Sequence, residues 1–326
     1  MPTNFERRRF YQRVCTGTKA YPNRTDYAIT CPDGVGVVMC RSVFPGVEFS
    51  INDFRASRCL ECYDGDELFQ LDFCCAGRFE CAFSPQEHCI LAPGDLVAHC
   101  CVEQSDTESA FPMGYYQGVN LTIDCQRAAA FSSRHFGALA PDFQALQDRL
   151  LHGHWFGVRR AGQKCADVFW ELFTTAIDEP PQLLGLKLLE LFWLLNYMPP
   201  DDTPPAYFPK AQIDLVKRMR ENFDSAPENY VSVDVLSQEY QISVSQLQKV
   251  FKQLYGVPIY QYVRERRLER AAKALRETRR TVTEIALDAG FTNPGKFAES
   301  FRKRYGLTPT QFRTARKQNT EMEQSY

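Results

Sequence analysis

Residues 282–291 read Val-Thr-Glu-Ile-Ala-Leu-Asp-Ala-Gly-Phe, and this stretch decides the fold of the C-terminal third of the chain. One face of a two-turn helix is marked by its apolar positions Val282, Ile285, Ala286 and Ala289. Gly290 follows, and glycine can adopt the positive φ that a tight turn between helices requires. Asn293 then offers an N-cap to a second helix with the apolar face Phe297, Phe301 and Tyr305. The stretch predicts a helix-turn-helix motif.

The same pattern occurs about fifty residues earlier, so the sequence contains an internal repeat. The corresponding positions of the first copy are Val233, Leu236, Tyr240, Ile242, Leu247, Phe251, Tyr255 and Gly256. Each copy predicts a short helix, a turn, a longer helix and a Tyr-Gly stop. Gln241 stands where the second copy has Gly290, and a positive φ costs a non-glycine residue about 1 kcal/mol. The first turn is therefore predicted to be the less favourable one.

The outward faces of the two longer helices carry residue types that recognise DNA. Such side chains hydrogen-bond to base edges or phosphates, and an α-helix fits the major groove. The predicted DNA-binding residues are Ser243, Ser245, Gln246, Gln248, Lys249, Lys252, Asn293, Gly295, Lys296, Glu299, Arg302 and Lys303. Two such helices in one rigid unit can enter successive major grooves about 34 Å apart. A solvated helix face has a similar composition, but the duplication and the local charge favour DNA binding.

Residues 259–278 predict a helix that connects the two copies and fixes their separation. Its apolar positions are Tyr262, Val263, Leu268, Ala271, Ala272 and Leu275. The basic positions Arg264, Arg266, Arg267, Arg270 and Lys273 lie largely on the other side. We expect some of these cations to contact phosphates and an equal share to be solvated.

The net charge of -2 hides a strong asymmetry between the two parts of the chain. Residues 1–209 hold 17 Lys and Arg against 26 Asp and Glu, whereas residues 210–326 hold 21 against 14. A basic C-terminal part suggests a polyanionic partner, because each cation near a phosphate releases a condensed counterion.

The N-terminal part predicts a β domain followed by helices. Short apolar runs between turn residues predict strands at 35–40, 68–75, 79–83, 89–92, 96–99 and 115–123, in a sandwich or small barrel. The turn at residues 92–95, Ala-Pro-Gly-Asp, predicts a hairpin. Helical periodicity covers residues 141–197, and its last helix is apolar on more than one side, so it is either deeply buried or paired with a second copy. Four prolines within residues 198–205 mark a linker.

The C-terminal residues resemble the DNA-binding domain of the AraC/XylS family of bacterial regulators. The resemblance rests on residues 267–271 (Arg-Leu-Glu-Arg-Ala), on residues 282–291, and on residues 301–306 (Phe-Arg-Lys-Arg-Tyr-Gly) with Thr308, Pro309, Phe312 and Arg313. It implies a seven-helix, all-α domain with two helix-turn-helix motifs. Residues 77–80 and 90–96 are loosely similar to hairpins of the cupin-like barrel that family members carry as a sensor.

Together these features predict a multidomain protein of α and β structure. The expected parts are a cupin-like β sensor domain (1–140), a helical dimerisation or packing segment (141–197), a Pro-rich linker (198–210), the double helix-turn-helix domain (211–317) and a tail (318–326). The expected function is sequence-specific transcription regulation. Its expected partners are double-stranded promoter DNA, a small-molecule effector, a second copy of the chain and RNA polymerase.

Other chemistry has weaker support in the sequence. The histidines His88, His99, His135, His152 and His154 do not form the set that a metal-dependent cupin uses, and no nucleophile motif appears, so we expect no metal, no cofactor and no enzyme. All thirteen cysteines precede residue 166, and their odd number predicts reduced thiols. Cys59 and Cys62 form one CxxC, so a metal- or thiol-responsive regulator is an alternative, as is an enzyme domain tethered to DNA. Since no secretory or membrane-spanning segment is apparent, we expect a cytoplasmic protein.

Overall fold

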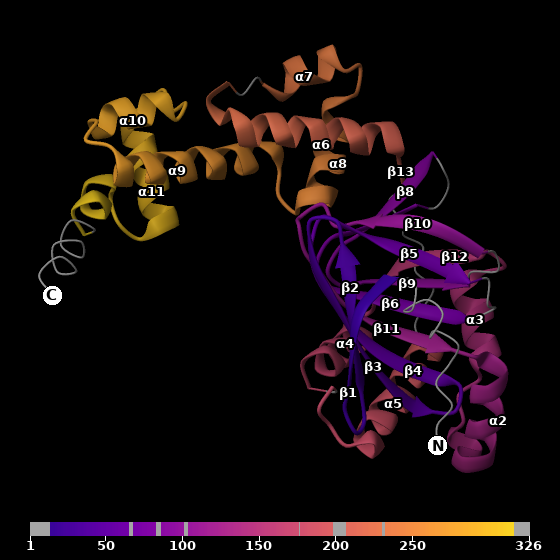
Figure 1. The fold of residues 1–326 in the computed structure, drawn as a ribbon. Coiled ribbons are helices and arrows are strands. Elements are labelled where there is room, and N and C mark those ends of the chain that lie inside the picture. The colour runs from indigo at the N-terminus through magenta and orange to yellow at the C-terminus, as the bar shows by residue number, and fades with distance from the viewer. Residues whose placement is uncertain are drawn as a thin grey trace, which may run out of the picture. The chain divides into compact units, whose positions relative to one another are not determined.

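The computed structural model describes residues 14–64, 68–82, 86–100, 104–175, 177–197, 207–229 and 232–315. The chain divides into two compact units, residues 1–210 and residues 211–326 (Figure 1). The first unit contains the sheets and the second is helical. The predicted combination of an N-terminal β-rich part and a C-terminal helical part is confirmed.

The strands of the first unit form two antiparallel sheets. The larger has eight strands in the order β1 (Cys15–Ala20), β2 (Thr25–Cys31), β3 (Gly34–Phe44), β4 (Val47–Arg55), β11 (Tyr116–Ile123), β6 (Phe69–Gly77), β9 (Asp95–Cys100) and β12 (Phe156–Arg160). The smaller has five, in the order β13 (Tyr207–Pro209), β8 (Glu87–Leu91), β7 (Phe79–Ala82), β10 (Gln104–Ala110) and β5 (Arg58–Asp64). Each of the six apolar runs predicted as strands contains a strand, and residue 83, the end of one run, lies outside the described residues.

Neither sheet closes on itself within the described ranges, so the cupin-like barrel of the sequence analysis is not confirmed. The turn at residues 92–95 also differs from the prediction. It reverses the chain, with Gly94 at φ 90° and the Asp95 N–H donating to the Ala92 carbonyl over 2.9 Å. However, β8 and β9 belong to different sheets, so the turn is a crossover and not a hairpin. Local turn chemistry fixes the reversal of the chain, while the strand pairing depends on distant partners.

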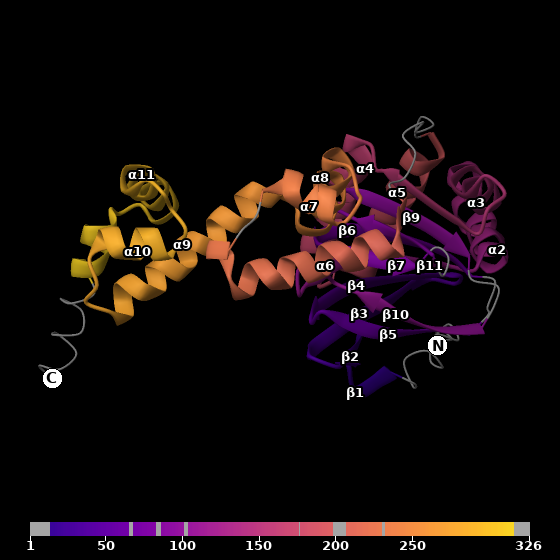
Figure 2. The same cartoon turned by 90° about the horizontal axis from the view of Figure 1, so that it is seen from above.

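One face of the larger sheet packs against helices (Figures 1 and 2). These are α2 (Cys125–Phe136), α3 (Phe143–Leu151), α4 (Gln163–Thr175) and α5 (Pro181–Tyr197), with the 3-10 turn η1 (Gly137–Leu139) after α2. In this layer Phe73 of β6 stacks on Phe169 of α4, with ring centroids 4.5 Å apart. The helical region begins at Cys125, earlier than predicted, and strand β12 interrupts the predicted helical segment 141–197.

The end of the predicted linker is structured. Residues 198–206 lie outside the described part of the chain, as does the tail 318–326. Residues 207–209 are strand β13, which pairs with β8, and Phe208 is fully buried. Helix α6 begins directly at Lys210. Among the described residues, no helix combines the length and the apolar character that crossing a membrane would need.

The second unit is built from helices α6 (Lys210–Ser225), α7 (Val233–Glu239), α8 (Val244–Tyr255), α9 (Ile259–Glu277), α10 (Val282–Asp288) and α11 (Pro294–Tyr305). The 3-10 turn η2 (Pro227–Asn229) follows α6, and residues 309–315 are again helical. Helix α9 runs between α8 and the α10–α11 pair (Figure 2). The two predicted helix-turn-helix motifs are therefore α7–α8 and α10–α11.

Candidate nucleic-acid interface

The two turns match hydrogen bond by hydrogen bond. In the first, the Tyr240 N–H donates to the Leu236 carbonyl over 3.0 Å. In the second, the Ala289 N–H donates to the Ile285 carbonyl over 3.0 Å. Each turn then closes with a bond from the next apolar residue back to the first helix, from Ile242 to Ser237 at 3.2 Å and from Phe291 to Ala286 at 2.9 Å. The sequence repeat is therefore a repeat of backbone structure.

The helix ends follow the same duplication. Ser232 and Thr281 cap the first helices by accepting backbone N–H bonds, and Ser243 and Asn293 cap the second ones. The second helices both end at glycines in the left-handed region, Gly256 at φ 78° and Gly306 at φ 75°. The caps pair backbone groups at the helix ends within the motif itself, so these groups need no partner from outside the motif.

Helix α10 of the second copy begins with a capping box formed by Thr281 and Glu284. Glu284 accepts a hydrogen bond from the Thr281 N–H at 2.7 Å, while the Glu284 N–H donates back to the Thr281 hydroxyl at 3.2 Å. The bond from the Thr281 backbone N–H lowers the pKa of Glu284, because it stabilises the carboxylate form.

Apolar side chains lock each motif onto α9. In the second copy, Phe297 and Phe301 are fully buried and join a cluster with Leu268 and Leu275 of α9. In the first copy, the buried side chains of α8 are Leu247, Val250, Phe251, Leu254 and Tyr255. All six predicted apolar positions of α9 are buried. Because these side chains are buried against α9, the two motifs are held at a fixed spacing within this unit.

The predicted DNA-binding residues of α8 fall into two groups. Ser243, Ser245, Lys249 and Lys252 are exposed. Gln246 and Gln248 are partly buried and hydrogen-bond within the unit: the Gln246 Nε2 donates to Gln212 Oε1 over 2.9 Å, and the Gln248 Oε1 accepts from the Ile259 N–H at 3.4 Å. The second bond ties α8 to the start of α9, a structural role that the sequence did not indicate.

The predicted residues of α11 all lie on its open side. Asn293, Gly295, Lys296, Glu299, Arg302 and Lys303 are exposed. The Asn293 Oδ1 accepts the N–H groups of Gly295 at 2.8 Å and Lys296 at 3.1 Å, so its side chain is occupied as the N-cap. The side chains of Lys296, Glu299, Arg302 and Lys303 stand clear of the core, which makes α11 the more open of the two reading helices.

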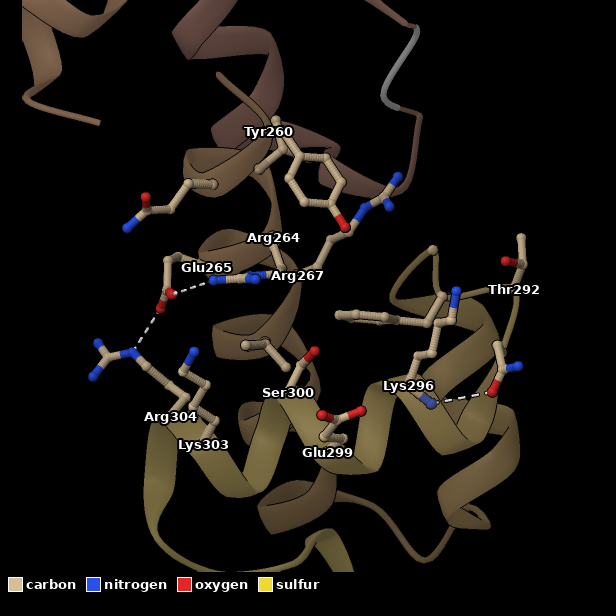
Figure 3. A pocket seen from close by; sticks show the side chains of 16 residues that line it. Tyr260, Arg264, Glu265, Arg267, Thr292, Lys296, Glu299, Ser300, Lys303 and Arg304 are labelled. Atoms are coloured by element: carbon tan, nitrogen blue, oxygen red, sulfur yellow. Dashed lines mark hydrogen bonds and ion pairs between the residues drawn. The ribbon is translucent and has the colours of Figure 1, made fainter. Parts of the chain in front are cut away.

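The structure separates the basic residues of α9 by what they contact. Arg266 bonds to Glu269 over 2.7 Å, and Arg270 pairs with Glu228. The Arg267 Nε donates to the Pro227 carbonyl over 2.9 Å. Arg264 instead faces a groove between α9 and α11 (Figure 3).

Arg267 also explains the glycine of the second turn. A Cβ built on Gly290 would lie 2.9 Å from the Arg267 guanidinium, in addition to requiring a positive φ of 82°. Glycine is therefore favoured there for two reasons. Gln241 adopts φ 53° in the equivalent turn, so the strain expected at this residue is present.

Most of the cysteines that the structure describes are buried. Burial raises the pKa of Cys75 and of Cys125 to about 12 each, and it raises the pKa of Cys74 further still. Such thiols are poor nucleophiles near neutral pH. Cys59 of the CxxC is buried, while the Cys62 side chain and Cys101 lie outside the described residues. Within the described ranges, no three His, Cys, Asp or Glu side chains are grouped to hold a metal ion.

Residues 236–315 match a family model described as a helix-turn-helix domain. The probable transcription factor PqrA of Proteus vulgaris is 36% identical over 83 residues, which cover 26% of this chain and 68% of PqrA. The HTH-type transcriptional regulator ExsA of Pseudomonas aeruginosa is 26% identical over 136 residues, 42% of this chain and 49% of ExsA. The matched part thus spans about half the length of ExsA.

A solved structure of a transcriptional regulator with an AraC-type DNA-binding domain, from Chromobacterium violaceum, is 26% identical and covers 33% of this chain and 93% of its own, with a TM-score of 0.29. The residues matched by the family model, 236–315, contain most of both duplicated motifs, and the match to PqrA covers 68% of its length. The chain belongs to the AraC/XylS family of transcriptional regulators.

Proposed function

We propose that this protein is a cytoplasmic, sequence-specific transcription regulator that binds two adjacent major-groove segments of promoter DNA through α8 and α11. The observation that carries the proposal is the duplicated motif, with matched turns, matched caps and two outward helix faces joined by one packed helix. The DNA contacts are proposed to come from the exposed residues of these faces. A surplus of seven positive charges over residues 210–326 supports a polyanionic partner.

We propose activation as the regulatory outcome, with RNA polymerase as a further partner. The relatives VirF of Yersinia enterocolitica and RhaR of Mannheimia succiniciproducens are named transcriptional activators. The match covers 50% of VirF and 28% of RhaR, so an activating role for this chain is a proposal.

We also propose that the first unit binds a small polar effector between its sheets. On the face of the larger sheet away from the helices, His99 Nε2 lies 2.9 Å from Asp72 Oδ2, and Asn120 donates to Asp72 Oδ1 over 2.8 Å. Ser50, 1% exposed, has no hydrogen-bond partner for its hydroxyl within the described residues. Burying such groups costs free energy, so a polar interior suggests a ligand-binding role rather than a purely structural one.

The chain leaves the first unit at Lys210, the residue at which α6 begins. Strand β13 is part of the smaller sheet, and the Lys210 N–H at the start of α6 donates to the Gln86 carbonyl over 2.8 Å. A change in the packing of β8 would therefore act on the residue at which α6 begins. This supports ligand-dependent control of the DNA-binding unit.

A homodimer is proposed to form through α5. Its buried face holds Leu184, Leu188, Leu191, Phe192 and Leu195. A second row, Leu183, Leu186, Glu190, Trp193 and Tyr197, follows heptad spacing, and Leu186 and Tyr197 are 63% and 75% exposed. The row is apolar except at Glu190, and exposed apolar side chains of this kind favour pairing with a second copy of the helix.

The proposal is tested by selecting sites from a random duplex library with the full-length protein. A regulator that reads two grooves should enrich one motif with two conserved blocks separated by about one helical turn. The comparison variant carries both Lys249→Ala and Lys296→Ala, one replaced side chain in each reading helix. Its selected sites should show weaker sequence preference in both blocks. Recovery of unrelated sequences by the native protein would contradict the proposal.

A further inference from the structure

The groove between α9 and α11 has a volume of about 970 Å³ and is positively charged (Figure 3). Five cations line it, Arg264, Arg267, Lys296, Lys303 and Arg304, against the two carboxylates of Glu265 and Glu299. A second, smaller groove, of about 500 Å³, lies along the later turns of α9 and holds Lys273, Arg276, Glu269 and Glu277. Its formal charges cancel, so of these two grooves the first is the one that favours an anion.

Pairing inside the first groove leaves donors available to a ligand. Glu265 accepts from Arg304 over 2.7 Å, and its other oxygen is 3.9 Å from an Arg264 amino group. The Arg264 Nε–H is buried and has no acceptor within the described residues. Lys303 forms no ion pair within the same ranges. The donors that a ligand can reach are therefore the exposed ammonium of Lys303 and the exposed part of the Arg264 guanidinium, whose side chain is 33% exposed.

The donors are of the kind that binds phosphate. Arginine and lysine heads and the hydroxyls of Tyr260 and Ser300 line the groove, and such groups supply the backbone contacts of DNA-binding proteins. Helix α9 joins the two reading helices, so a duplex whose successive major grooves are read by both helices carries a stretch of sugar-phosphate backbone between them, on the same unit as this groove.

We propose, as an extension of the proposed function, that this groove holds that stretch of backbone, with Arg264 and Lys303 contacting phosphate oxygens. Lys296 and Glu299, at the groove's edge towards the start of α11, remain directed to the bases. The groove then positions α11 by a contact that carries no sequence information.

The dependence of DNA affinity on salt tests this assignment with the full-length chain. Each phosphate contact contributes about 0.9 to the slope of log affinity against log salt concentration. Arg264→Gln and Lys303→Gln should each lower the slope by about that amount, so the loss of affinity between 50 and 200 mM salt becomes about three- to fourfold smaller. Both variants should weaken specific and random duplexes by the same factor. The control is Lys273→Gln, in the neutral groove, which should keep the native slope.

Two outcomes would overturn the inference and leave the proposed function intact. One is a native slope in both Arg264→Gln and Lys303→Gln. The other is a loss confined to the specific duplex, which would assign these residues to base recognition. If the native protein binds no duplex at low salt, the proposed function itself fails, and this result is distinct from either.

Discussion

Gln241 and Gly290 occupy the same place in two successive turns, and both have positive φ, 53° and 82° respectively. In each turn the residue's N–H donates to a carbonyl near the end of the preceding helix, at 3.4 Å for Gln241 and 2.9 Å for Gly290. The backbone thus adopts the left-handed conformation whether or not glycine is present. The surrounding helices impose the turn, and Gln241 carries the strain.

Replacing Gln241 by glycine should stabilise the protein. Glycine accepts a positive φ without a Cβ clash, so we expect a gain of about 0.5–1 kcal/mol after the larger entropy loss of glycine is included. Urea unfolding of the full-length protein, followed by circular dichroism at a helical wavelength, measures the change.

The matched control is Gln238→Gly, at an exposed position inside α7. There the same replacement should destabilise by about 1 kcal/mol, because the backbone is helical. Equal destabilisation by both variants would show that the Gln241 turn is not strained.

The helix-turn-helix unit could be predicted from sequence because its signals are local. Caps such as Asn293, the turn glycine and the apolar spacing of α10 and α11 all lie within about 25 residues, and each agrees with the others. Strand β4 was not among the predicted runs, since its polar residues Glu48, Ser50 and Asn52 face the interior between the sheets and interrupt the apolar pattern. The separation of β8 from β9 depends on long-range pairing, which no local pattern encodes.

The internal contacts of Gln246 and Gln248 could not be predicted for a related reason. Their type and position on α8 match residues that read bases, but their partners, Gln212 and Ile259, lie 34 and 11 residues away along the chain. The exposure of a lysine such as Lys296 depends only on its position on the helix, so it can be predicted without knowing a distant partner. The outer face of α11 was accordingly easier to predict than that of α8.

Lys296→Ala should weaken binding to a specific site by about 1–3 kcal/mol. The side chain is exposed next to the N-cap of α11, and the loss of a base contact should also relax the preference at one position of the site. Fluorescence anisotropy with the native site and its single-position variants measures both effects. Arg279→Ala, an exposed cation just after α9, is the control and should change affinity much less. A uniform loss on every duplex would place Lys296 on a phosphate instead.

The buried thiols should react slowly with iodoacetamide. Burial disfavours the thiolate, so with a pKa of about 12 for Cys75 and Cys125 only about one ten-thousandth of each is ionised at pH 8. The alkylation rate should rise about tenfold per pH unit up to pH 12, whereas an ordinary thiol levels off above its pKa of about 8.5. Mass spectrometry of the native protein, against protein unfolded in urea, measures the protection. Rapid labelling at neutral pH would contradict it.

The thiol-responsive alternative has its own test at the CxxC. If Cys59 and Cys62 sense oxidants or zinc, either treatment should change DNA affinity in the native protein and not in the double serine variant. We expect unchanged affinity in both, because Cys59 is buried among apolar side chains.

Leu186→Glu on α5 should convert a dimer into a monomer. The side chain is 63% exposed, so the folded subunit tolerates a charge there, while in a helix pair a new carboxylate replaces an apolar contact and adds to the charge of Glu190 four residues further on. Analytical ultracentrifugation should show half the native mass. Gln182→Glu, an exposed polar position at the start of the same helix, should keep the native mass. A native protein that sediments as a monomer would refute the dimer.

Methylation interference on a selected site tests the central claim most directly, because it reports which guanines must be open in the major groove. Two rigidly spaced reading helices predict two clusters of interfering positions, about one helical turn apart on the same face of the duplex, and the Lys296→Ala variant should lose interference at one position of the cluster read by α11 while the other cluster is kept. A single cluster, or interfering positions that do not recur at about one helical turn, would contradict the reading of two successive grooves.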